Sequence, residues 1–100
     1  MTEAVNSTGI DVVSLHMLNL VKGMACALVD RADLVQVEAL HEGDGTLLRL
    51  RVAPTDVGKV IGKQGRTARS MRTILSAASM KMKHRFALDI IEDDGSSPSA

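Results

Sequence analysis

Two glycines three positions apart, Gly62 and Gly65, separate two segments that otherwise carry helical patterns. Thr55 predicts the N-cap of a short helix that runs to about Ile61, and a longer helix is expected over residues 66–82. Glycine lacks a Cβ atom and tolerates positive φ. The chain between the helices can therefore form a tight loop whose backbone comes close to a ligand.

The longer helix carries an apolar stripe at spacings of three and four residues, which is typical of a helix that packs on a sheet. The stripe consists of Ala68, Met71, Leu75, Ala78 and Met82. Basic residues of the same helix fall outside the stripe: Arg66 and Arg69 lie away from it, and Arg72 lies on its flank.

Residues 34–40 and 46–52 alternate apolar and polar side chains around turn-forming residues 42–45, which predicts a β-hairpin. Residues 85–91 predict a third strand. We expect Leu48, Leu50 and Val52 to point inward, because side chains alternate between the two faces of a strand. Arg49 and Arg51 then share the other face.

A further helix is predicted from Ser14 to Val29 by apolar residues spaced three and four apart. That stripe consists of Leu18, Val21, Ala25 and Leu28. Other apolar residues widen it, and we expect them to join the core, with a partner surface as the alternative: Met17, Leu20 and Met24. The predicted order is α-β-β-α-α-β, an α+β fold with helices packed on one side of a three-stranded sheet.

The length and composition predict one domain. The chain has 100 residues, 45% of them hydrophobic, and Phe86 is its only aromatic residue of the Phe, Trp and Tyr class. We expect the folded domain to cover 14–92, with flexible tails at 1–13 and 93–100. The single cysteine, the lack of a signal-peptide pattern and the lack of a long apolar run predict a cytoplasmic protein without membrane contact.

The formal net charge is zero, but the charges are separated along the chain. Residues 54–85 contain eight bases and one acid, a net charge of +7, so the remaining residues carry −7. The glycine loop lies in the basic segment, together with Lys59, Lys63 and Arg66. Unsatisfied N–H groups and a positive dipole at the start of the following helix also favour anions. These features predict a phosphate-binding loop.

This stretch resembles the KhpA family of small bacterial KH-domain proteins, over roughly residues 17–92. The resemblance is carried by Arg51-Val52-Ala53-Pro54, by Gly58-Lys59-Val60-Ile61-Gly62-Lys63-Gln64-Gly65-Arg66-Thr67-Ala68, by Met71-Arg72-Thr73-Ile74 and by the closing Asp89-Ile90. It implies a type II KH domain that binds single-stranded RNA, acts as an RNA chaperone, and pairs with a KhpB (Jag)-type KH protein in cell-wall homeostasis and cell-length control. A homodimer is a further expectation.

In a KH domain the Gly-x-x-Gly loop clamps about four nucleotides in a cleft beside the sheet. The resemblance places Lys59, Gly62, Lys63, Gln64, Gly65 and Arg66 at this loop. Val60 and Ile61 lie on the adjoining short helix, where they form either an apolar floor for bases or part of the core. Arg69 and Arg72 add attraction to phosphates. The scarcity of aromatic residues predicts weak affinity from one copy and little sequence preference.

Enzymatic functions fit the residues less well. A P-loop needs four residues between its glycines and a hydroxyl residue after the lysine, whereas Gly58 and Gly62 are separated by three and Gln64 follows Lys63. No cofactor or metal is predicted. His16, His41 and His84 are scattered and are expected to be surface residues, and Cys26 is expected to be an inert packing residue. The alternative that stays open is a KH-fold protein-interaction module with minor or no RNA binding.

Overall fold

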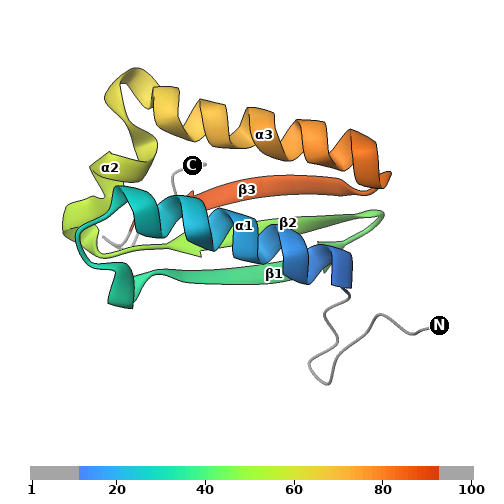
Figure 1. Ribbon diagram of the computed structural model, residues 1–100, viewed down its shortest axis with the longest axis horizontal. Coiled ribbons are helices and arrows are strands. Elements are labelled where there is room, and N and C mark those ends of the chain that lie inside the picture. The colour runs from blue at the N-terminus through green and yellow to red at the C-terminus, as the bar shows by residue number, and fades with distance from the viewer. Residues whose placement is uncertain (1–11, 93–100) are drawn as a thin grey trace.

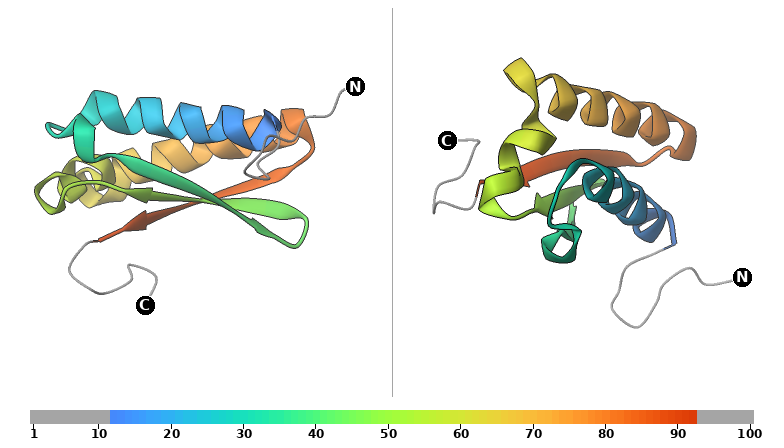
Figure 2. Two further views of the ribbon diagram at one scale, coloured as in Figure 1. Left: turned by 90° about the horizontal axis from the view of Figure 1, so that it is seen from below. Right: turned by 60° about the vertical axis from the view of Figure 1, so that its left-hand side comes forward.

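The computed structural model describes residues 12–92. The two predicted tails lie outside these residues except at 12 and 13, which belong to the first helix, so this helix begins two residues earlier than predicted. The secondary structure runs α1 (Val12–Leu28), β1 (Gln36–Glu42), β2 (Gly45–Arg51), α2 (Val57–Ile61), α3 (Arg66–Met82) and β3 (Arg85–Ile91). The three strands form one sheet in the order β1-β2-β3, and both long helices cover the same face of it (Figures 1 and 2). The predicted α+β fold and the α-β-β-α-α-β order of a type II KH domain are confirmed.

The hairpin has the predicted turn, but its first strand is shifted along the chain. β1 and β2 pair antiparallel from Gln36 opposite Arg51 to Glu42 opposite Gly45, and the turn at Gly43 has a φ of 59°. Residues Ala32–Leu34 form a 3₁₀ turn instead of the start of the strand. The turn is held by backbone hydrogen bonds, such as the 3.0 Å bond from the Leu34 N–H to the Arg31 carbonyl. β1 therefore begins two residues later than predicted.

β3 lies at the edge of the sheet and pairs parallel with β2. A parallel pair needs a long crossover connection, which α2 and α3 supply between the two strands. Side chains that alternate toward the helices form the floor of the core: Leu48, Leu50, Val52, Phe86, Leu88 and Ile90 are all buried. The inward face predicted for β2 is confirmed.

The two long helices bury their stripes against this floor. On α3, Ala68, Met71 and Leu75 are buried, and Ala78 and Met82 pack against the core from partly buried positions, as predicted. On α1 the buried line is Ser14, Met17, Val21 and Ala25. Of the predicted stripe, Val21 and Ala25 are buried and Leu18 packs against the core from a partly buried position. Leu28, in the last turn of the helix, is 38% exposed.

The widened apolar face of α1 divides between core and surface. Met17 is buried, as expected, and Met24 packs against the core from a partly buried position, whereas Leu20 is 38% exposed. The expectation that all three join the core is wrong for Leu20. None of the helices within residues 12–92 is both long and apolar enough to span a membrane.

Candidate nucleic-acid interface

The loop between α2 and α3 depends on a glycine at position 62. Gly62 has a φ of 80° and a ψ of 171°, a backbone conformation that residues with a Cβ atom rarely adopt. A Cβ atom there would lie 2.7 Å from Cβ of Thr67 and 2.8 Å from its backbone nitrogen. Close packing of the loop against the start of α3 therefore excludes every other residue type unless the backbone moves.

The tip of the loop is exposed to solvent. Lys63 and Gln64 are exposed, and the Gly65 N–H donates a 3.1 Å hydrogen bond to the Gly62 carbonyl, which closes the turn. Gln64 and Gly65 both have positive φ, 57° and 75°. A Cβ at Gly65 would meet no atom within 4 Å, so its backbone faces open space. Any ligand at this tip can touch main-chain atoms directly.

The first turn of α3 presents positive charge next to the tip. Gly65 precedes the helix and has no side chain to cap it, and the first turn contains no acidic residue. Unsatisfied backbone N–H groups at a helix start carry a partial positive charge, and Arg66 adds a full one from an exposed position. The geometry suits an anion such as a phosphate group.

The ammonium group of Lys59 is paired with acids instead of lying at the loop tip. Its ammonium nitrogen lies 3.4 Å from a carboxylate oxygen of Asp30 and 3.4 Å from one of Asp56. Asp30 and then Asp56 raise the pKa of Lys59 above its usual value. Lys59 was predicted to supply positive charge at the loop. In the structure it instead forms ion pairs with Asp30, which follows α1, and with Asp56, which precedes α2.

Asp56 anchors this corner and was not singled out as a site residue. It is 1% exposed, and one carboxylate oxygen accepts a 3.0 Å hydrogen bond from the Arg31 backbone N–H. That bond, followed by one from the Asp30 backbone and by Lys59, lowers the pKa of Asp56. Asp56 immediately precedes α2 and so ties the start of this helix to the segment after α1. It was visible in the sequence only as the single acid of the basic segment.

The apolar residues beside the loop differ in accessibility. Val60 is fully buried in the core, which corresponds to the core alternative and not to a floor for bases. Ile61 is partly buried and packs against the core from the end of α2. Of the two, only Ile61 offers surface to a ligand.

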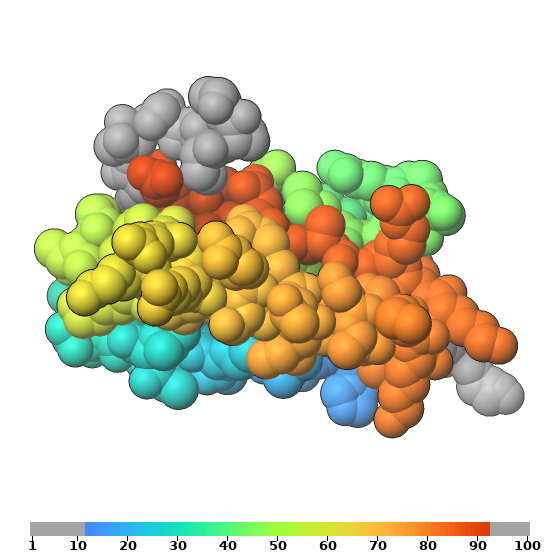
Figure 3. Space-filling model, turned by 90° about the horizontal axis from the view of Figure 1, so that it is seen from above, coloured from blue at the N-terminus to red at the C-terminus, as the bar shows by residue number. Residues whose placement is uncertain are grey.

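Further arginines lie along α3, and one of them contacts β3. Arg69 is exposed, and the Arg72 guanidinium donates hydrogen bonds of 3.3 and 3.2 Å to the Leu88 carbonyl. We call the boundary between α3 and β3, marked by this contact, the α3–β3 seam. Figure 3 shows parts of β3, in red, beside α3, in yellow to orange. Because β3 is an edge strand, its backbone groups on this side are not paired with another strand of the described sheet.

The histidines match the expectation of scattered surface residues only in part. His41 and His84 both contact the buried Thr46 hydroxyl, through Nδ1 at 3.2 Å and Nε2 at 2.8 Å. His16 is exposed, as expected. His41 lies opposite Thr46 in the hairpin, so their contact follows from the pairing of neighbouring strands. His84 is 38 positions from Thr46 along the chain and meets it only in the folded structure. Within residues 12–92 no group of three His, Cys, Asp or Glu side chains is arranged to hold a metal ion.

Comparison with known proteins gives a consistent result. The family model described as "KhpA/KhpB, KH domain" matches residues 19–90. The RNA-binding protein KhpA of Caldanaerobacter subterraneus subsp. tengcongensis is 49% identical over 75 residues, which cover 75% of this chain and 100% of the relative. The RNA-binding protein KhpA of Halalkalibacterium halodurans is 49% identical over 76 residues, covering 76% and 100%.

A third relative, the RNA-binding protein KhpA of Treponema pallidum, is 51% identical over 74 residues, which cover 73% of this chain and 91% of the relative. No solved structure matches the chain significantly. The matched region contains α2, the glycine loop and α3 in full.

Proposed function

Because this chain belongs to the KhpA/KhpB family of KH domains, we propose that it is an RNA-binding protein that grips single-stranded RNA through the Gly62–Gly65 loop. The observation that carries the proposal is the loop itself. Its tip is exposed, its backbone faces open space at Gly65, and an uncapped helix start with Arg66 lies beside it.

The grip on RNA is electrostatic and main-chain based. Phosphate oxygens accept hydrogen bonds from backbone N–H groups at the loop and at the start of α3, while Lys63 and Arg66 supply full charges. Gln64 adds an amide at the tip, and the small size of Gly62 and Gly65 allows the RNA backbone to approach. The loop thereby holds the sugar–phosphate chain without reading its sequence.

The bases lie on the α3–β3 seam in this proposal. Ile61 provides the apolar surface next to the loop. On the outer edge of β3, backbone groups other than the Phe86 N–H and the Leu88 carbonyl, which are bound by Ser79 and Arg72, can meet base edges. Arg69 and Arg72 attract phosphates along the helix. Lys59 and Val60, which the family resemblance also indicated, act through the structure of α2 rather than by touching RNA.

The wider role follows the family and is also a proposal. We infer a non-enzymatic RNA chaperone of the cytoplasm that pairs with a KhpB-type KH protein and influences cell-wall homeostasis and cell length. A chaperone requires weak, exchangeable contacts. An aliphatic surface supports weak contacts because it lacks the aromatic side chains on which bases stack, and Phe86 is buried.

A second candidate function is an assembly module with little RNA binding. The favouring observation is exposed apolar surface on both long helices, at Leu15 and Leu20 of α1 and at Ile74 and Met80 of α3. Exposed apolar residues on a small domain can mark a contact with a second copy or with another KH protein. This candidate does not require the glycine loop to bind anything.

A salt titration distinguishes the two candidates. Affinity for a fluorescently labelled, unstructured RNA is measured by anisotropy at several salt concentrations. Phosphate contacts predict a logarithm of affinity that falls linearly with the logarithm of salt, with a slope of about −0.7 for each phosphate neutralised on a single strand. No binding at low salt would leave the assembly module as the function.

A further inference from the structure

Polar and basic side chains continue along α3 well beyond the glycine loop. Polar residues recur at helical spacings of three and four along α3, and Lys83 follows its last turn: Arg69, Arg72, Ser76 and Ser79. Two of these residues contact β3. Arg72 binds the Leu88 carbonyl, and the Ser79 hydroxyl accepts a 3.0 Å hydrogen bond from the Phe86 N–H. The line ends where α3 turns into β3.

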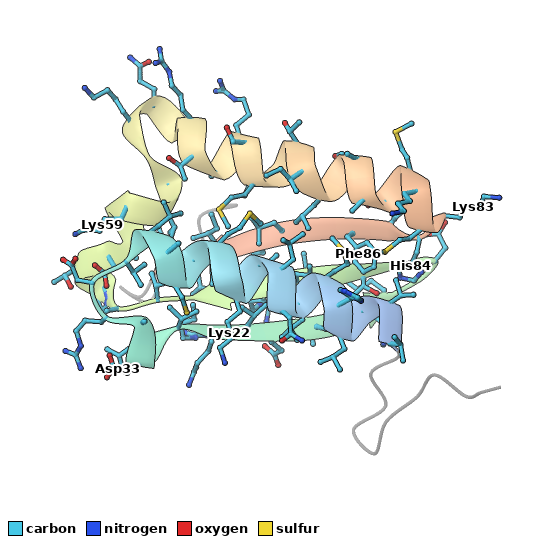
Figure 4. All side chains as sticks on the ribbon, viewed as in Figure 1. Lys22, Asp33, Lys59, Lys83, His84 and Phe86 are labelled. Atoms are coloured by element: carbon cyan, nitrogen blue, oxygen red, sulfur yellow. The ribbon has the colours of Figure 1, made fainter. Side chains whose placement is uncertain are left out.

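At that end the structure holds a hollow of about 340 Å³. Its lining combines cationic, apolar and aromatic side chains with a single acid: Asp44, Ser79, Met80, Lys83, His84 and Arg85. Met80 is 82% exposed, although it is a large apolar residue. We call this site the α3–β3 corner. It lies at the opposite end of α3 from the glycine loop, about 25 Å away at the rise of an α-helix (Figure 4).

Two of the corner residues are held in defined positions. Lys83 has a φ of 56° in the left-handed region, where glycine is the usual residue after a helix. The His84 ring accepts or donates a 2.8 Å hydrogen bond with the buried Thr46 hydroxyl and lies 4.8 Å from Phe86, centroid to centroid. A histidine ring fixed in this way offers a platform on which an unstacked base can lie.

We propose that the α3–β3 corner is a second RNA contact site, which takes a nucleotide of the same strand that the glycine loop grips. The base lies against His84 and Met80, and its phosphates contact Lys83 and Arg85. The strand then follows the α3–β3 seam past Arg72 between the two sites. This inference rests on the proposed RNA binding at the loop, and it makes the RNA footprint longer than the roughly four nucleotides of a KH cleft.

The test compares a short and a long RNA. A tetranucleotide fills only the loop site, whereas an unstructured RNA of about twelve nucleotides also reaches the corner. The corner variant combines Lys83→Asn with Arg85→Gln, because asparagine tolerates the left-handed conformation. The matched control removes the same charge by Lys81→Gln with Lys22→Gln. Both control residues are exposed; Lys22 lies on α1, and helical spacing places Lys81 on the side of α3 opposite the flank that faces β3.

We expect the corner variant to bind the long RNA about fivefold more weakly, with a salt slope smaller by about 0.7 for each lost phosphate contact. Its affinity for the tetranucleotide should not change, and the control should bind both RNAs as the unmodified protein does. Equal losses in variant and control, or an unchanged affinity for the long RNA, would overturn the corner site while leaving the loop proposal intact. Failure of the unmodified protein to bind either RNA would instead refute the proposed function.

Discussion

At the scale of single residues, Gly62 has the strictest steric requirement in the loop. We predict that Gly62→Ala destabilises the fold by about 1–3 kcal/mol or displaces the loop, because the new Cβ would press against Thr67. The affinity for RNA should fall in either case. Urea unfolding and anisotropy measure the two effects.

The matched control is Gly58→Ala, at the glycine four positions earlier in the chain. Gly58 lies within α2, a Cβ atom at this position would meet nothing within 4 Å, and the backbone there does not need positive φ. Alanine should therefore stabilise the protein by about 0.5–1 kcal/mol. Equal losses of stability at positions 58 and 62 would contradict the steric explanation.

Asp56 is the second residue with a specific prediction. Its pKa is lowered from the usual 3.8, so the folded state binds its proton more weakly than the unfolded state does. Its ionised carboxylate therefore contributes stability in full above about pH 4, and the contribution is lost as the pH falls through the lower folded pKa. We predict that Asp56→Asn lowers the urea midpoint at pH 7 and flattens its decline at acid pH.

Asp33→Asn is the control for this measurement. Arg31 also lowers the pKa of Asp33, but that pair is exposed, at 57% and 65% of the two side chains. Screening by water leaves such pairs little effect on stability. We expect Asp56→Asn to change the decline of the urea midpoint at acid pH more than Asp33→Asn does. The opposite order would mean that Asp56 does not anchor α2.

At the scale of structural elements, the loop tip can be changed without disturbing α2 or α3. We predict that Lys63→Asp with Gln64→Asp abolishes RNA binding and leaves the fold intact. Both residues are exposed, and aspartate tolerates the left-handed conformation at position 64. Anisotropy gives the affinity and circular dichroism the fold.

The control for this variant carries the same change in charge on α1. Lys22→Glu with Asn19→Glu also lowers the net charge by three, at exposed positions away from the loop. It should weaken binding only modestly through the overall field. If both variants lose binding alike, net charge and not the glycine loop governs the interaction.

On α1, neighbouring apolar residues should behave differently. Met17→Glu places an unpaired charge in the core and is predicted to cost about 4 kcal/mol or more, which unfolds a small domain. Leu20→Glu should remain folded, because Leu20 is 38% exposed. If α1 forms the contact with a second copy, sedimentation will show weaker self-association for Leu20→Glu; unchanged association would exclude Leu20 from that contact.

At the scale of the whole molecule, the charge separation and the narrow approach at the loop predict selectivity for single strands. The segment that contains α2 and α3 carries a net charge of +7, which attracts any nucleic acid at low salt. At near-physiological salt, an unstructured RNA should bind more tightly than its duplex, because close contact with the loop backbone leaves no room for a second strand. Tighter duplex binding would assign the main site to the arginines of α3.

Local patterns in the sequence were sufficient to predict the element order, the inward face of β2 and the buried stripe of α3. Helical and strand periodicities depend on neighbouring residues, so Ala68, Met71 and Leu75 could be assigned to the core without knowledge of the fold. The turn positions were equally readable from glycines. Residues 66–82 and 85–91 form the helix and strand that the sequence predicts.

Tertiary structure alone decided which side chains meet across the chain. Lys59 is engaged by Asp30 from the end of α1, Arg72 by the Leu88 carbonyl of β3, and His84 by Thr46. Sequence periodicity carries no information about such pairs, because each joins residues at least 16 positions apart whose distance depends on how the helices pack on the sheet.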